Sequence, residues 1–100
     1  MSELLESRSV SRKTARDGKH EVTAKTAARL RALPSPFDVI VDGMADRGTL
    51  VPMPCACRGE AHEHWFIEAQ ALRSLEAGRE ATTSIGVDGY TVEIHSSPTR

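Results

Sequence analysis

Residues 55–67 read CACRGEAHEHWFI and hold both cysteines, two of the four histidines and the single tryptophan of the chain. A Cys-x-Cys pair precedes a His-x-His pair, and the four residues 58–61 between the two pairs contain a glycine. The stretch lies where two segments of similar pattern, residues 20–54 and 62–96, meet. We therefore treat it as the junction around which the chain is organised.

The two segments align when the second is shifted back by 42 residues, the separation of His20 and His62. Six of the fourteen positions 20–33 are then identical, namely His20/His62, Glu21/Glu63, Ala27/Ala69, Leu30/Leu72, Arg31/Arg73 and Leu33/Leu75. Chance similarity in a helix rich in Ala, Leu and Arg is the alternative explanation. The shared order of strand, helix, strand, Asp-Gly turn and strand favours a repeat. A unit of about 40 residues is too small to bury its own helix and strands, so the two units are expected to share one core.

Residues 25–33 are predicted to form the short helix of the first segment, because Ala27, Leu30 and Leu33 recur at helical spacing. Thr23 or Thr26 is expected to cap its start, and the proline at 34 ends it. The strands expected around this helix are 20–24, 37–41 and 49–53. Prolines at 52 and 54 mark the last of these strands as an edge or a bulged strand.

The second segment is expected to hold a strand at 64–67, a helix at 68–77 that ends before Gly78, and strands at 81–87 and 90–95. Asp42-Gly43 begins a turn in the first segment, and Asp88-Gly89 is predicted to be a two-residue turn of type I′. Tyr90, Val92 and Ile94 share one face of the last strand. The sequence therefore predicts an α+β fold in which two strand–helix–β-hairpin repeats share one small barrel-like or sandwich core.

Residues 1–19 differ in composition from the predicted globular domain, residues 20–96. They are rich in Ser, Arg and Lys, and Leu4, Leu5 and Val10 are their only aliphatic residues. This composition predicts a basic, flexible arm. Such an arm could serve a phosphate or an acidic partner through Arg8, Arg12, Lys13, Arg16 and Lys19. It contains no aromatic residue, so it offers nothing on which nucleic-acid bases can stack.

The overall composition is that of one soluble globular domain. The chain has 100 residues, 39% apolar and 27% charged, and a net charge of -1. Residues 1–33 carry eight Lys or Arg and four Asp or Glu, a net of +4, whereas residues 34–100 carry five and ten, a net of -5. No apolar run approaches the roughly 20 residues of a membrane helix, and no signal peptide is evident. The two cysteines are expected to be reduced thiols of a cytoplasmic protein.

Part of the second segment resembles a known family. Residues 65–75, WFIEAQALRSL, followed by Gly78 and by residues 85–94, IGVDGYTVEI, are similar to the swapped-hairpin domains of the AbrB and MazE type. The resemblance implies two paired units, here a tandem pseudo-dimer, and a DNA-binding regulator or antitoxin. The chain departs from that pattern at Glu68, where the family usually has proline, and at residues 78–80, where it usually has Gly-Asp.

The Cys/His junction is a candidate metal site. If residues 49–57 and 62–67 pair as a hairpin, Cys57 lies opposite His62 and Cys55 opposite His64, and all four side chains share one face. Two thiolates and two imidazoles are a common structural zinc set, although the Cys-x-Cys and His-x-His spacing is not the usual one. The alternative is a pair of small buried thiols beside exposed turn histidines. A cysteine nucleophile with a histidine base is disfavoured because the short chain has no evident substrate pocket.

The function expected from these features is non-enzymatic binding. We expect a small regulatory or inhibitory protein, a monomer or homodimer, that acts by contact with another macromolecule. A protein partner is favoured over DNA because acidic residues flank the second helix, namely Glu60, Glu63, Glu68, Glu76 and Glu80. Trp65 is a candidate partner-binding residue, since aromatic side chains dominate interface hot spots. The alternatives are an AbrB-like DNA-binding regulator that uses Arg12, Lys13, Arg16, Arg29 and Arg31, and a zinc-stabilised interaction module. His20 and His95 are expected to lie on the surface.

Overall fold

The computed structural model describes residues 2–55 and 62–97, and this part of the chain forms one mixed, seven-stranded sheet with three short helices. In chain order the elements are β1 (Glu3–Ser9), α1 (Arg12–Asp17), β2 (Lys19–Val22), α2 (Ala24–Leu30), β3 (Phe37–Val41), β4 (Met44–Cys55), β5 (His62–Glu68), the 3-10 helix η2 (Gln70–Ser74), β6 (Glu80–Ile85) and β7 (Val92–Ser96).

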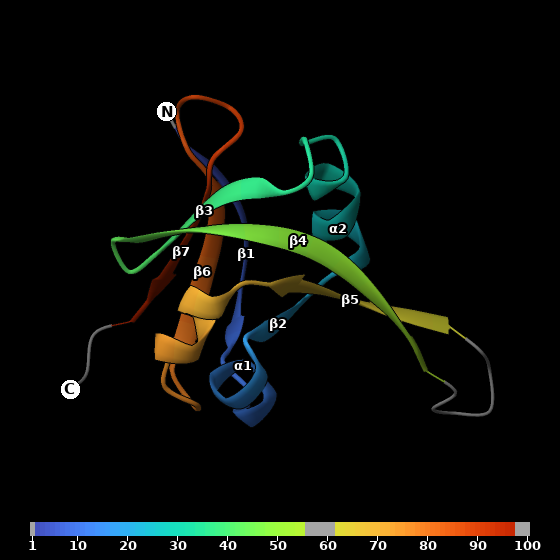
Figure 1. Cartoon of the computed structure of the whole chain (residues 1–100), viewed down its shortest axis with the longest axis vertical. Helices are drawn as coiled ribbons and strands as arrows, with labels where there is room; N and C mark the ends of the chain where they lie inside the picture. The colour runs from blue at the N-terminus through green and yellow to red at the C-terminus, as the bar shows by residue number, and fades with distance from the viewer. Residues whose placement is uncertain (1, 56–61, 98–100) are drawn as a thin grey trace.

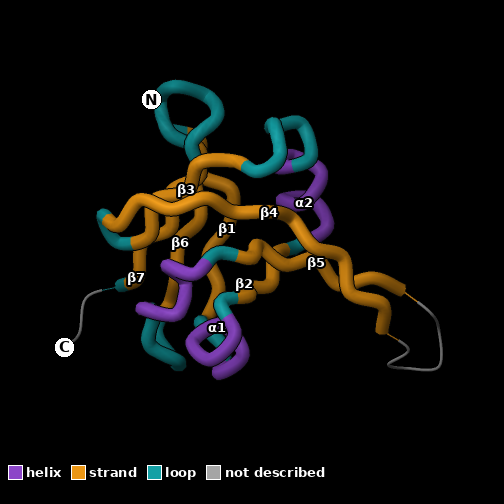
Figure 2. Tube along the Cα trace, in the orientation of Figure 1, coloured by secondary structure: helices purple, strands orange, loops and turns teal. Residues whose placement is uncertain are grey.

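The strands follow the order β1-β6-β7-β3-β4-β5-β2, and every neighbouring pair is antiparallel except β3 and β7, which are parallel. The long strand β4 pairs with a different neighbour along each half of its length. Its first residues, 44–48, pair with β3, and its remaining residues, 49–55, pair with β5. Figures 1 and 2 show the result, in which β4 crosses in front of β7, β6 and β1 and β5 runs beside its second half. The sheet is therefore strongly curved and nearly closed, which confirms the barrel-like form expected from the sequence.

Side chains join the two edge strands, β1 and β2, although no backbone ladder connects them. The Glu6 Oε1 atom of β1 accepts hydrogen bonds from the backbone N–H and the hydroxyl of Thr23, just after β2, both at 2.9 Å. Arg8 Nη1 of β1 lies 3.7 Å from Glu21 Oε1 of β2. We call this contact line between β1 and β2 the seam.

The core is aliphatic, as the low aromatic content requires. Alternating residues of β3 and β7 point into it, so Val39, Val41, Val92 and Ile94 are fully buried. Ile67 of β5 and Leu72 of η2 complete its centre. The strand predicted at 37–41 is confirmed at Phe37–Val41, because its β-branched residues fit a pleated, buried surface.

Helix α2 begins at Ala24, one residue before the predicted start, and ends earlier than predicted. The Thr23 hydroxyl accepts a hydrogen bond from the Thr26 N–H and caps the helix. Ala27 and Leu30 are buried, and Leu33 packs partly buried against the core beyond the helix end. The helix stops at Leu30 instead of residue 33, because a residue that precedes proline is disfavoured in helical conformation and the chain must turn before position 34.

The N-terminal segment is part of the fold, which corrects the expectation of a flexible arm over residues 1–19. Strand β1 pairs with β6 along its length, from Glu3 opposite Ile85 to Ser9 opposite Glu80. Helix α1 follows, capped by the Ser11 hydroxyl at its start and by Gly18 at its end. Composition alone missed these elements because β1 has no apolar alternation and is held mainly by its backbone ladder.

The second predicted helix is shorter and tighter than expected. Glu68 belongs to β5, where it lies opposite both Thr49 and Lys19, and Ala69 is extended with φ −159° and ψ 141°. Only residues 70–74 are helical, as a 3-10 helix. The helix predicted over 68–77 is therefore wrong at both ends, because pairing on both sides of β5 extends the strand to residue 68.

Of the two predicted Asp-Gly turns, the one at Asp42-Gly43 is confirmed and the one at Asp88-Gly89 is not. Asp42 and Gly43 both have positive φ, 47° and 84°, which suits the tight turn between β3 and β4. In contrast, β6 and β7 are joined by the longer loop 86–91, in which Asp88 keeps a negative φ. The type I′ turn predicted at Asp88-Gly89 is wrong, and Tyr90, expected in the last strand on the face of Val92 and Ile94, is exposed in this loop before β7 begins.

The repeat predicted from the sequence recurs in element order but not in strand pairing. The order strand, helix, strand, strand occurs in β2-α2-β3-β4 and again in β5-η2-β6-β7. However, among the described strands β4 pairs with β5, whereas β7, its counterpart in the second set, does not pair with β2. Two equivalent halves are therefore not shown.

Candidate functional site

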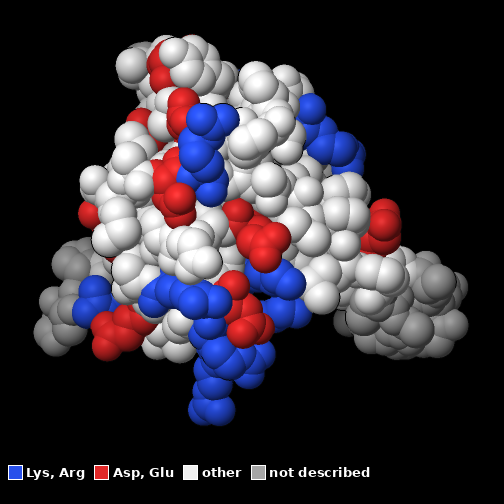
Figure 3. Space-filling view, in the orientation of Figure 1, with Lys and Arg blue, Asp and Glu red and all other residues white. Residues whose placement is uncertain are grey.

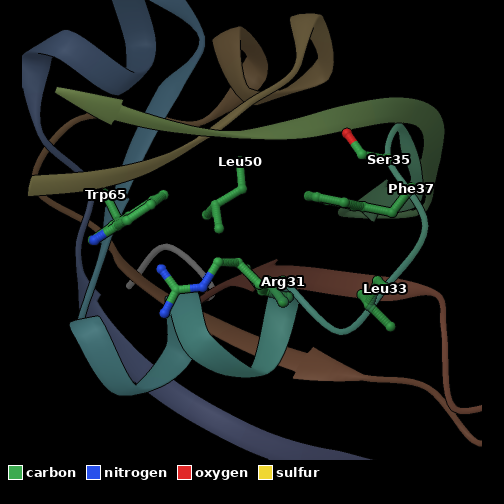
Figure 4. A pocket seen from close by; sticks show the side chains of 7 residues that line it. Arg31, Leu33, Ser35, Phe37, Leu50 and Trp65 are labelled. Atoms are coloured by element: carbon green, nitrogen blue, oxygen red, sulfur yellow. The ribbon is translucent and has the colours of Figure 1, made fainter.

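An apolar groove of about 220 Å³ runs between α2 and the β4–β5 hairpin. Its lining residues are Leu30, Arg31, Leu33, Ser35, Phe37, Leu50 and Trp65. Figure 4 shows Trp65 and Phe37 at opposite ends, Leu50 between them, and Arg31 reaching from the end of α2 toward Trp65. The groove thus has apolar walls and one cation.

Strand register places the aromatic and aliphatic walls of the groove. Trp65 of β5 lies opposite Pro52 of β4, and Leu50 is two residues before Pro52. The side chains of Trp65 and Leu50 therefore lie on the same face of the hairpin. Phe37 lies opposite Gly48, where an added Cβ would come within 3.1 Å of the Phe37 ring. A glycine at position 48 therefore leaves room for the ring that closes one end of the groove.

Trp65 and Phe66 lie on opposite faces of β5, as their neighbouring positions predict. Phe66 is buried, and the Lys13 ammonium of α1 sits 4.8 Å from the centre of its ring. Trp65 is half-buried at the border of the core. The residue proposed from sequence as a partner contact is therefore the one that retains an accessible ring.

Arg31 stacks on Trp65, with the guanidinium carbon 4.7 Å from the ring centre. Within the part of the chain that the structure describes, no carboxylate forms an ion pair with Arg31. Arg29, two residues earlier, differs because it pairs with Glu3 at 3.1 Å. Arg31 is consequently a cation held over Trp65 at the edge of an apolar groove, without an ion pair to any carboxylate of residues 2–55 and 62–97.

The remaining basic residues proposed from sequence do not join Arg31 in one surface. Arg12, Lys13 and Arg16 lie on α1, whereas Arg29 and Arg31 lie on and just after α2. Figure 3 shows the Lys and Arg atoms over α1 separated from those over α2 by acidic and uncharged surface. Arg16 is also engaged by Asp17 at 2.9 and 3.0 Å.

The predicted Cys/His hairpin exists, but its register differs from the expected one. Cys55 lies opposite His62, and Met53, not a cysteine, lies opposite His64. The pairing is therefore shifted by two residues from the expected one, which had Cys57 opposite His62 and Cys55 opposite His64. Cys57 lies outside the described residues. No group of three or more His, Cys, Asp or Glu side chains arranged to hold a metal ion occurs among the residues described.

A chain of polar contacts instead links the two histidines to the seam. His62 Nε2 and His64 Nε2 are 3.1 Å apart, and His64 Nδ1 is 2.8 Å from Glu21 Oε2. Glu21 in turn faces Arg8 across the seam. Glu21 was not among the metal ligands proposed from sequence, because only the antiparallel pairing of β2 with β5 brings it beside the hairpin.

His20 is buried and not on the surface as expected from sequence. It is only 1% exposed, its Nδ1 is 3.4 Å from the Thr14 hydroxyl, and its Nε2 has no hydrogen-bond partner in the described structure. Burial lowers the pKa of His20 below its ordinary value of 6.5, so the neutral form is favoured. His95, by contrast, is exposed as expected, with Nε2 3.4 Å from Glu93.

Comparison with known proteins finds no family model that matches the sequence, and no curated protein or solved structure that matches the chain. Within the described residues, no helix has both the length and the apolar character needed to cross a membrane.

Proposed function

We propose that this protein is a non-enzymatic binding protein, with a regulatory or inhibitory role, whose groove receives a short segment of a partner protein. The segment would carry an apolar side chain next to a carboxylate. The observation that carries this proposal is Arg31, which is stacked on Trp65 at the edge of an apolar groove and has no described carboxylate beside it.

The apolar walls supply the affinity in this proposal. Burial of one Leu-, Met- or Phe-sized side chain is worth about 1.5–3 kcal/mol. The groove, at about 220 Å³, is smaller than the roughly 300–1,000 Å³ of most small-molecule and cofactor sites. Its size therefore suits an anchoring side chain of a partner better than a whole metabolite.

The cation supplies the selectivity. A guanidinium presents a planar fork of donors that matches a carboxylate, and it can keep its stacking contact with an aromatic ring while it does so. Trp and Arg are also the residue types most enriched among interface hot spots. An acidic residue next to the apolar anchor would thus be preferred, whatever the net charge of the partner as a whole.

A displayed peptide library, selected against the full-length chain, tests this function. We expect enriched peptides to share an apolar residue beside Asp, Glu or a free carboxyl terminus. Their affinity should fall at least tenfold for Arg31→Glu. It should be restored when the acidic residue of the peptide is exchanged for Lys, because the charge pair is then rebuilt with reversed signs.

Arg12→Glu is the matched control, since it makes the same charge change on exposed α1 outside the groove. The same two variants distinguish the alternative of DNA binding. Peptides that bind Arg31→Glu as tightly as the unchanged chain would reject the groove. Duplex DNA binding that weakens with salt and is lost in Arg12→Glu would favour the alternative instead.

A further inference from the structure

The strongest feature outside the groove is the histidine pair on β5. His62 and His64 are two residues apart on one strand, so their side chains lie on the same face. Their rings meet edge to face, with centroids 4.8 Å apart, and their Nε2 atoms converge to 3.1 Å.

We propose that His62 and His64 form a two-imidazole chelate for a divalent transition-metal ion, and that Glu21 is its outer-sphere carboxylate. This site differs from the four-ligand cysteine and histidine set expected from the sequence, since it needs no thiolate and adds a residue from β2.

The separation of the two nitrogens supports chelation. Imidazole nitrogens bind Zn²⁺ at about 2.0–2.1 Å, so two of them at a tetrahedral angle lie roughly 3.3–3.4 Å apart. The observed 3.1 Å is within a few tenths of an ångström of that bite distance. Two Nε2 atoms at this separation can therefore bind one ion.

The contact with Glu21 prepares His64 for this role. An ionised carboxylate only accepts hydrogen bonds, so the 2.8 Å contact places a proton on His64 Nδ1. In the neutral ring Nε2 then carries the lone pair and faces His62 Nε2. A carboxylate on the far nitrogen is the usual partner of a metal-bound histidine, where it orients the ring and raises its basicity.

The same carboxylate connects the pair to the seam. Glu21 Oε1 faces Arg8 of β1, while its Oε2 faces His64 of β5, so one side chain spans three strands. An ion held by the histidines would therefore stabilise the arrangement of β1, β2 and β5 in the folded state. Nitrogen ligands of this kind suit Zn²⁺, Ni²⁺ and Cu²⁺ better than Mg²⁺ or Ca²⁺.

Titration of the reduced full-length chain with ZnCl₂ and NiCl₂, followed by calorimetry, tests the site. We expect one ion per chain and a melting temperature that rises with metal concentration. His62→Gln and His64→Gln should each weaken binding at least tenfold. Glu21→Gln should weaken it about 10–100-fold, the usual effect of removing an outer-sphere partner. His95→Gln, which removes an exposed histidine that also neighbours a carboxylate, is the matched control and should change nothing.

A second measurement needs no substitution. Long-range ¹H–¹⁵N spectra of the unchanged chain should show Zn²⁺-dependent shifts at Nε2 of His62 and His64 and none at His95. The proposal is overturned if the chain binds no ion, or if binding is equal in the unchanged chain and in both histidine variants. Metal binding that is as tight in Glu21→Gln as in the unchanged chain would exclude the outer-sphere role of Glu21.

Discussion

At the residue scale, Gly18 illustrates a position where both conformation and space demand glycine. It ends α1 with φ 71°, and its carbonyl accepts a hydrogen bond from the Ala69 N–H at 3.0 Å. A Cβ at this position would lie 2.7 Å from the Ala69 carbonyl oxygen, a backbone atom that cannot rotate away. The contact between α1 and the start of η2 therefore depends on the absence of a side chain.

Gly18→Ala should lower the free energy of unfolding by more than the roughly 1–2 kcal/mol that a left-handed backbone conformation costs an L-residue. Gly78→Ala is the control, because Gly78 has a similar positive φ of 93° but no atom within 4 Å of the added Cβ. Urea unfolding of both variants separates steric clash from backbone strain. Equal losses in the two variants would show that the close approach to Ala69 contributes nothing.

His20 provides a second residue-scale prediction, because it is buried with a lowered pKa. Between that lowered pKa and 6.5, the unfolded state binds more protons than the folded state. Stability therefore rises with pH across this window and is lost as pH falls below 6.5. The carboxylates with lowered pKa values are Glu6, Asp17, Asp46 and Asp88, whose ordinary values are 4.5 for Glu6 and 3.8 for the three Asp residues, so their contributions to stability change at lower pH than that of His20.

Denaturant unfolding at pH 7.5 and 5.5 should show a stability difference that is reduced in His20→Gln. His95→Gln should retain the full difference, since that histidine is exposed. The readout is the change with pH and not the stability at one pH, so a general destabilisation by His20→Gln does not obscure it. A His20→Gln variant with the unchanged pH dependence would contradict the prediction.

At the element scale, η2 depends on a residue from another strand. Asp46 of β4 accepts hydrogen bonds from the Ala71 N–H through Oδ2 and from the Arg47 N–H through Oδ1, both at 2.8 Å. The hydrogen bond from the Ala71 N–H is the largest cause of the lowered pKa of Asp46, and the bond from the Arg47 N–H is the next. Ala69, the residue before the helix, provides no side-chain cap of its own, so Asp46 supplies the cap from a distance in sequence.

Asp46→Ala should cost about 0.5–2 kcal/mol, the usual range for loss of a capping side chain. Asp38→Ala is the control, since Asp38 is an exposed residue of β3 that pairs with the exposed Arg47 at 3.4 Å, and its loss should stay within about 0.5 kcal/mol. Thermal and urea unfolding measure the loss of stability in both variants. An Asp46→Ala variant as stable as Asp38→Ala would show that η2 does not need the cap.

The sequence pattern predicted those elements that are stabilised by residues close to one another in the chain. The β-branched alternation predicted β3, and the spacing of Ala27 and Leu30 predicted the buried stripe of α2. In contrast, the cap of η2 comes from a residue 25 positions away from Ala71. The two Asp-Gly pairs differ because the β3–β4 ladder continues to Val41 and Met44, whereas the β6–β7 ladder ends at Ile85 and Val92.

The residues of the candidate sites also divide into those that the sequence indicated and those that only the fold brings together. Trp65 was identified because a lone tryptophan in a short chain is a strong signal, and His62 and His64 because of their spacing. Arg31, taken from sequence for a phosphate contact, lies over Trp65 only because α2 packs beside β5. Glu21 reaches His64 through the pairing of two strands separated by more than 40 residues, which no local pattern indicates.

At the scale of the whole molecule, the seam joins the two edge strands of the curved sheet, β1 and β2. Burial alone would raise the pKa of Glu6, but hydrogen bonds from Thr26 and Thr23 and the charge of Arg8 lower it instead. The Glu6 side chain is only 9% exposed, and its charge is held by donors from the residues that follow β2. A charge-assisted bond in such a setting is worth more than an exposed ion pair, because water competes less for the two partners.

A double-mutant cycle of Glu6→Ala and Thr23→Ala should therefore give a coupling energy of about 1.5–3 kcal/mol, the range for hydrogen bonds to charged groups. The cycle of Glu3→Ala and Arg29→Ala is the control. That pair also joins β1 to the region of α2, at 3.1 Å, but its side chains are 50% and 35% exposed, so about 0.2–1 kcal/mol is expected. Hydrogen exchange of the β1 amides should accelerate in Glu6→Ala and not in Glu3→Ala, because only the first change opens the seam. Equal coupling in the two cycles would mean that the sheet is held closed by its core alone, and that β1 stays in place through its ladder with β6.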